Sequence, residues 1–181
     1  MAEVITPVGA GAAPWARRLV VALVQKGVTA TCSEADHNRY GGLEGDSNLP
    51  DFRVAVGGPA ENSFVAVVLQ AAGPAYRAAL DGQLARQGWA RLLVPAERSL
   101  REVWQPGADL RGPRDLPVIV VAGRDQASTE AAVDALSAEV VGGRVVVEQP
   151  AALVPQPEQV PEWTAALLNR GTCLLYTSRC V

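Results

Sequence analysis

The sequence is poor in the residues that mark several classes of protein. Of its 16 basic residues only Lys26 is a lysine, and the formal net charge is −3, so no basic surface for nucleic acid is expected. Its three cysteines lack a C-x-x-C spacing, which argues against a disulfide framework and a zinc knuckle and indicates a reducing compartment. No basic leader precedes an apolar run, and no run reaches the length of a membrane span. We expect a cytoplasmic protein that binds neither membranes nor nucleic acid.

The residues that are present favour a folded core. Hydrophobic residues make up 49% and charged residues 19% of the 181 positions, as in a globular protein of one ordinary domain, or one domain with part of another. Short apolar runs alternate with amphipathic stretches, a pattern typical of parallel strands joined by helices. We predict that residues 1–149 form an α/β accessory domain with a layered, mostly parallel sheet and flanking helices.

The clearest strand is "LPVIVVAG" (116–123), a continuous β-branched run of the kind that is buried on both faces of a parallel sheet. Asp125 or Ser128 is expected to cap the helix that follows. "GGRVVVEQ" (142–149) is predicted to close a strand-helix-strand unit. The same patterns predict strands near 3–8, 28–32, 51–58 and 91–95, and helices near 14–26, 60–73 and 74–88.

The composition of the sequence changes after residue 149, where prolines become frequent. Four prolines within residues 150–162 are too dense for a helix or a central strand and predict a linker. Residues 163–172 read as the first strand of a truncated β-sandwich, without a partner strand in the remaining chain. Residues 173–181, "CLLYTSRCV", are interpreted as a non-native tail. We therefore expect a fragment of a longer protein.

Polar residues gather between residues 31 and 54, after a predicted strand end, where ligands of α/β sheets bind. A calcium loop does not fit the spacing, and one histidine is too few for zinc. A proton-handling pair remains an alternative to a solvated turn in which Arg39 and Arg53 pair with carboxylates. We expect no catalytic or metal-binding residue. The candidates for contact with a polar substrate are Asp36, His37, Arg39, Glu44, Asp46 and Asn48.

A glycine turn offers a different hypothesis. Gly9 and Gly11 stand between a predicted strand and a predicted helix, as in phosphate-binding loops. Pro14 replaces the third glycine, and the sequence shows no clean strand-ending acid further on, although Glu34 is near. A stand-alone nucleotide- or flavin-binding domain is therefore an alternative, and a purely structural packing module is another.

Two stretches resemble a known family. "ADHNRYGGLEGDSNLPDFRVAVGGPAENSFVAVVL" (35–69) and "VEQPAALVPQPEQVPEWTAALLNRGT" (147–172), above all "ALLNRGT", are similar to the C-terminal region of bacterial α-mannosidases of glycoside hydrolase family thirty-eight, in their actinobacterial form. The resemblance implies a parent enzyme that hydrolyses α-mannosides with retention, using two carboxyl groups about 5 Å apart and a divalent metal, zinc.

The family carries this machinery in an earlier domain, and none of it maps onto this chain. The resemblance thus implies a non-catalytic piece without a cofactor, inactive alone. Its partners would be the remaining domains of the parent and the parent's mannoside substrate.

Overall fold

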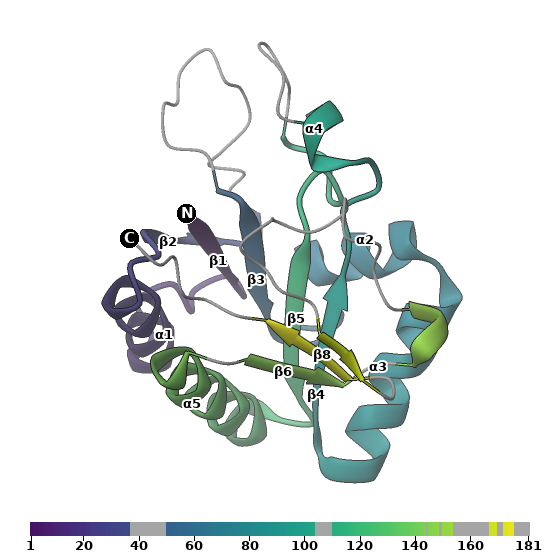
Figure 1. The fold of residues 1–181 in the computed structure, drawn as a ribbon. Helices are drawn as coiled ribbons and strands as arrows, with labels where there is room; N and C mark the ends of the chain where they lie inside the picture. The colour runs from purple at the N-terminus through teal and green to yellow at the C-terminus, as the bar shows by residue number, and fades with distance from the viewer. Residues whose placement is uncertain are drawn as a thin grey trace.

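The computed structural model is an α/β fold in which helices cover both faces of a central sheet (Figure 1). The predicted class, a layered and mostly parallel sheet with flanking helices, is confirmed. Among the helices of the described part, none has the length and apolar character needed to cross a bilayer. The structure describes residues 1–36, 50–103, 110–143, 145–148, 150–153, 167–169 and 172–175.

The central sheet contains β1 (Ala2–Thr6), β2 (Ala30–Glu34), β3 (Phe52–Val56), β4 (Trp89–Val94) and β5 (Val118–Gly123). Its five strands follow the order β2-β1-β3-β5-β4. All pairs are parallel except β4 with β5. The strand predicted at 116–123 is confirmed as β5, and all six of its residues are buried.

The reversed direction of β4 follows from its connection to β5. An antiparallel neighbour needs no crossover helix. Within the described residues, this connection holds only the four-residue helix α4 (Leu100–Val103). The apolar run that predicted the strand carries no information about its direction, so the sequence did not reveal this reversal.

Two pairs of helices cover the two faces of the sheet. α1 (Pro14–Gln25) and α5 (Gln126–Gly142) pack side by side on one face, and α2 (Ser63–Ala72) and α3 (Pro74–Gln87) cover the other (Figure 1). Alternate strand residues point to opposite faces, so each face has its own apolar core. The core under α1 and α5 includes Val4, Leu19, Val54, Val121 and Leu136, and the core under α2 and α3 includes Ile5, Val65, Leu80, Leu92 and Val120.

A second, three-stranded sheet contains β6 (Val145–Glu148), β7 (Leu167–Asn169) and β8 (Thr172–Leu175), in the order β6-β8-β7. The strand predicted within residues 142–149 is present as β6, but it pairs antiparallel with β8 and does not join the sheet that contains β5. The expected lack of a partner for the strand within residues 163–172 is wrong, because β7 pairs antiparallel with β8 in the chain that follows it. The domain boundaries themselves stay a prediction.

An ion pair supplies hydrogen-bond partners to backbone groups on the edge of β6 that faces away from β8. The Val146 amide donates to the Glu139 carboxylate at 2.9 Å, and Arg91 Nη1 donates to the Val146 carbonyl at 2.8 Å. Arg91 Nη1 also binds the Glu139 carboxylate at 2.6 Å, so α5, β4 and β6 are tied together. Arg91 is buried, and among the described residues its Nε and Nη2 groups have no hydrogen-bond partner. Its guanidinium carbon lies 5.5 Å from the centre of the Trp89 ring.

A second ion pair lies within the core beneath α2. Arg53 Nε donates to Glu3 at 3.0 Å, and both side chains are 4% exposed. The Ser33 hydroxyl donates to the other Glu3 oxygen at 2.6 Å. Arg53 also donates to the carbonyls of Leu110 at 2.5 Å and Gly112 at 3.1 Å. Among the described residues the ion-pair partner of Arg53 is Glu3 of β1, because the β1–β3 register places the two residues side by side. The expected pairing of Arg53 with carboxylates of the polar loop stays a prediction, because residues 37–49 lie outside the described part.

Candidate functional site

The carboxyl edge of the central sheet is the place where α/β folds of this kind bind ligands. The chain leaves β1 through α1 on one face and leaves β3 through α2 on the other. Because β1 and β3 are neighbours, the loops after them begin at a topological switch point. Any ligand site of the sheet is therefore expected among the loops after β1, β3 and β5.

The loop after β1 contains the predicted glycine turn. Gly9 has a φ of 78°, a conformation that favours glycine. The Gly11 amide donates to the Glu34 carboxylate at 3.3 Å, and a Cβ on Gly11 would lie 3.1 Å from the same oxygen. Glu34 is the last residue of β2. The expectation that no acid ends a strand cleanly is therefore wrong: turn, helix and acid meet as in a dinucleotide-binding unit.

The loop after β3 is held by a buried asparagine. Asn62 is fully buried, and its amide nitrogen donates to the carbonyls of Val56 at 2.8 Å and Ile5 at 3.3 Å. Its side-chain oxygen accepts the Val65 amide at 3.1 Å and so caps α2. One side chain therefore joins β1, β3 and α2 at the switch point. Pro7 lies close as well, because a Cβ on Gly57 would come within 3.2 Å of its ring.

The loop after β5 is also held by side-chain hydrogen bonds to the backbone. The Gly123 amide donates to the Thr129 hydroxyl at 2.9 Å. The predicted cap is confirmed: Asp125 accepts the Ser128 amide at 2.7 Å, and the Ser128 hydroxyl in turn accepts the Asp125 amide at 3.0 Å. Both hydrogen bonds from Ser128, the backbone one first, lower the pKa of the Asp125 carboxyl below its ordinary value.

This lowered pKa predicts an acid-sensitive helix cap. A carboxyl whose pKa falls on folding stabilises the protein above its ordinary value of 3.8, and the stabilisation is lost as pH falls through the lower folded value. We expect Asp125→Asn to keep a cap but flatten the stability profile between about pH 2 and 5. Urea midpoints at a series of pH values measure it. Ser128→Ala keeps the backbone donor and is expected to retain most of the pH dependence; an unchanged profile in Asp125→Asn would refute the assignment.

Gly123 is predicted to tolerate no side chain. A Cβ there would lie 2.2 Å from the Thr129 amide nitrogen and 2.5 Å from the Ser128 carbonyl carbon, both backbone atoms. Because the loop must shift, Gly123→Ala is expected to lower the free energy of unfolding by about 2 kcal/mol. Gly142→Ala, at the far end of α5, is the control, since a Cβ there meets no atom within 4 Å. Chemical denaturation of both variants decides it, and equal stabilities would contradict the prediction.

An open cleft of about 730 Å³ runs between α2 and α3 and reaches the loops after β3 and β5. Its charged groups are bonded within the protein. Arg124 donates to the carbonyls of Leu84 at 2.7 Å and Ala85 at 2.5 Å, where it closes the end of α3. Arg77 pairs with Asp81 at 2.9 Å. These contacts shape the cleft and leave a mixed, mostly apolar lining.

Of the six candidate substrate contacts, only Asp36 belongs to the described part. Asp36 is exposed, two residues beyond the end of β2, and the preceding Ala35 amide donates to the Thr6 carbonyl at 2.9 Å. The other five, His37, Arg39, Glu44, Asp46 and Asn48, lie outside the described residues, so their role stays a prediction.

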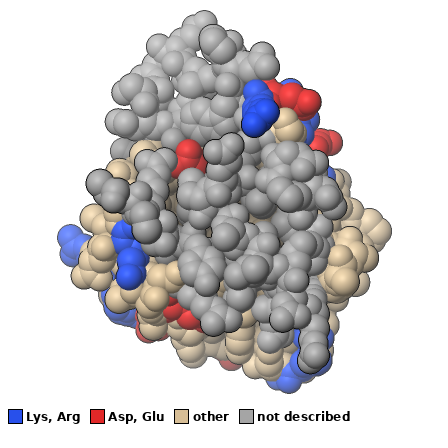
Figure 2. Space-filling model, in the orientation of Figure 1, with Lys and Arg blue, Asp and Glu red and all other residues tan. Residues whose placement is uncertain are grey.

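Neither a metal-ligand group nor, on the face in Figure 2, a broad charged patch is seen among the described residues. Nowhere in the described ranges do three or more His, Cys, Asp or Glu side chains come together as metal ligands. Figure 2 shows acidic and basic side chains interspersed around the margin of one face, without a broad patch of one sign among the described residues.

Comparisons with models of protein families, with the curated proteins and with the solved structures gave no match. The fold and the geometry of its loops are therefore the observations that bear on function.

Proposed function

We propose that the chain is a non-catalytic α/β accessory module of a larger glycoside hydrolase that resembles an α-mannosidase. One observation carries the proposal: polar side chains in the loops and the first helical turns at the carboxyl edge of the sheet bind the protein's own backbone. Asn62, Thr129 and Arg124 each hold a loop or a helix end in this way. Groups used to fix loops support a module that serves by its shape and its packing.

The parent's mannoside, its zinc ion and its other domains enter this proposal through the family resemblance. The polar residues 36–48 are proposed to face the substrate cleft or a neighbouring domain. A cytoplasmic location is part of the proposal, and it is supported by the three cysteines of the sequence, which lack a C-x-x-C spacing and so favour a reducing compartment.

The purified chain is expected to release no product from an aryl α-mannoside, because the paired carboxyls of a retaining glycosidase belong to another part of the parent. Absorbance of the released phenol measures it, with an intact α-mannosidase as the positive control. Turnover that survives a chelator and disappears in His37→Ala would overturn the proposal. So would a coding frame that lacks a catalytic domain upstream.

Glu34 favours a second candidate, a nucleotide- or flavin-binding domain. Its carboxylate stands at the end of β2 beside the glycine turn, where dinucleotide-binding folds place an acid that holds ribose hydroxyls. Thermal unfolding with NAD or FMN separates the candidates. A rise in Tm that is lost in Glu34→Gln and kept in Glu61→Gln would support this candidate, and an unchanged Tm supports the accessory module.

A further inference from the structure

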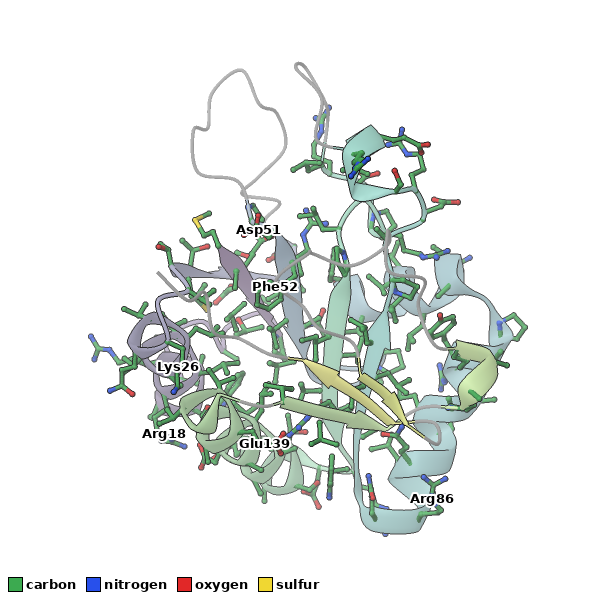
Figure 3. The ribbon with its side chains drawn as sticks, in the orientation of Figure 1. Arg18, Lys26, Asp51, Phe52, Arg86 and Glu139 are labelled. Atoms are coloured by element: carbon green, nitrogen blue, oxygen red, sulfur yellow. The ribbon has the colours of Figure 1, made fainter. Side chains whose placement is uncertain are left out.

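The outer surface between α1 and α5 carries an open groove of about 730 Å³. The two helices run in the same direction, because each follows a parallel strand of the same sheet. Arg18 in the second turn of α1 binds Asp134 at 2.8 and 3.0 Å, and Lys26 beyond the end of α1 comes within 3.7 Å of a Cβ position on Gly143, which follows α5. Figure 3 shows Arg18 and Lys26 along the side of α1 nearest α5.

Small side chains contribute much of the lining of this groove. Ala22 of α1 and Ser137 and Ala138 of α5 line it together with the larger Val21 and Val141. The Ser137 hydroxyl donates to the Val133 carbonyl of its own helix at 2.8 Å, so its proton is already used within α5. These five residues therefore present a largely apolar surface to the groove.

Exposed valines flank the groove. Val21 is 48% exposed and Val141 is 45% exposed, and both line the groove. Val24, one turn beyond Val21, is 53% exposed and extends the apolar surface of α1 next to the groove lining. A single exposed valine is ordinary, whereas neighbouring exposed valines on two helices are typical of a surface that contacts another protein. The spacing of Val21 and Val24 places both on one side of α1.

The charged residues that line the groove favour an acidic partner over a second copy of this chain. Arg17 and Arg18 line it, and no acidic residue of the described part does. Asp134 neutralises Arg18 through two hydrogen bonds, while Arg17 makes no ion pair with a described residue. In a symmetric dimer through this groove, two Arg17 side chains would meet beside an apolar surface, which like-charge repulsion disfavours. A partner with a carboxylate complements the surface.

We propose that this groove docks an amphipathic helix that presents an apolar stripe to Val21 and Val141 and a carboxylate to Arg17. A third helix packs into the furrow between two parallel helices through anchors three and four residues apart. The source of the helix rests on the proposed function: it is a neighbouring domain of the parent protein.

A pair of model peptides tests the groove on the complete 181-residue chain. Each is an alanine-rich helix of about 18 residues, long enough to be helical alone, with leucines at helical spacing and one central glutamate or, in its match, one lysine. Amide resonances of the labelled chain are followed during titration. We expect shifts at Val21, Ser137 and Val141, and affinity about threefold higher for the glutamate peptide, the size of a surface ion pair. Arg17→Glu is expected to reverse the preference.

Three results would overturn the inference: no shifts in the groove with either peptide, equal affinity for both in the parent chain and in Arg17→Glu, or sedimentation showing a dimer that Val21→Asp dissociates. Each leaves the proposed accessory role in place, because that role is tested by mannoside turnover. Conversely, turnover by the chain alone would refute the accessory role and leave the peptide result unaffected.

Discussion

Arg53→Met is expected to lower the free energy of unfolding by about 4 kcal/mol, since it leaves the buried Glu3 carboxylate without its cation. Glu3 and Arg53 are each 4% exposed, so water cannot replace the lost partner. The carbonyls of Leu110 and Gly112 also lose their donors. Urea denaturation monitored by circular dichroism gives the change directly.

Two further variants make this result specific. The double variant Glu3→Met, Arg53→Met removes both charges and is expected to recover about half of the loss, because an apolar pair replaces the uncompensated carboxylate. Arg77→Met breaks an exposed pair, with side chains 54% and 53% exposed, and is expected to cost less than about 0.5 kcal/mol. If Arg53→Met costs no more than Arg77→Met, the buried pair does not stabilise the fold.

Asn62→Ala is expected to lower the free energy of unfolding by about 3 kcal/mol. The change removes a helix cap and leaves the Val65 amide and the carbonyls of Val56 and Ile5 buried without their partner. Hydrogen exchange should locate the loss at the switch point, with faster exchange of amides at the start of α2 than in α5.

A serine at the same position separates the two roles of Asn62. Asn62→Ser keeps an oxygen that can cap α2 but loses both bonds to the strand carbonyls, so its stability is expected to lie between those of the wild type and Asn62→Ala. If Asn62→Ala stays within about 1 kcal/mol of the wild type, the asparagine does not hold the loops together, and the observation that carries the accessory role fails with it.

Local sequence patterns predicted the positions of the helices and strands well. The apolar run at 116–123 became β5, and Asp125 caps α5 as its spacing indicated. These features depend on residues close in the sequence, whose hydrogen bonds and burial follow from helix and strand geometry. The direction of β4 and the pairing of β6 with β8 depend on distant segments, and no local pattern encodes them.

The partners of the charged residues could not be predicted from local sequence patterns either. Arg53 sits beside an acidic loop in the sequence, yet its ion-pair partner is Glu3, 50 positions away, because the strand register decides which side chains meet. Glu34 lies 23 positions after Gly11 in the sequence, and only its place at the end of β2 brings its carboxylate to the Gly11 amide. No sequence motif predicts the groove between α1 and α5, since alanines and exposed valines are common on helices.

The ion pair on the edge of β6 also bears on how the chain behaves at high concentration. A free strand edge is a template on which strands of other molecules grow. At Val146 the Glu139 carboxylate and the Arg91 guanidinium occupy the positions that an incoming strand would need. The Glu139–Arg91 pair therefore leaves neither backbone group of Val146 available to an incoming strand, so it blocks strand addition at this residue as well as fastening β6.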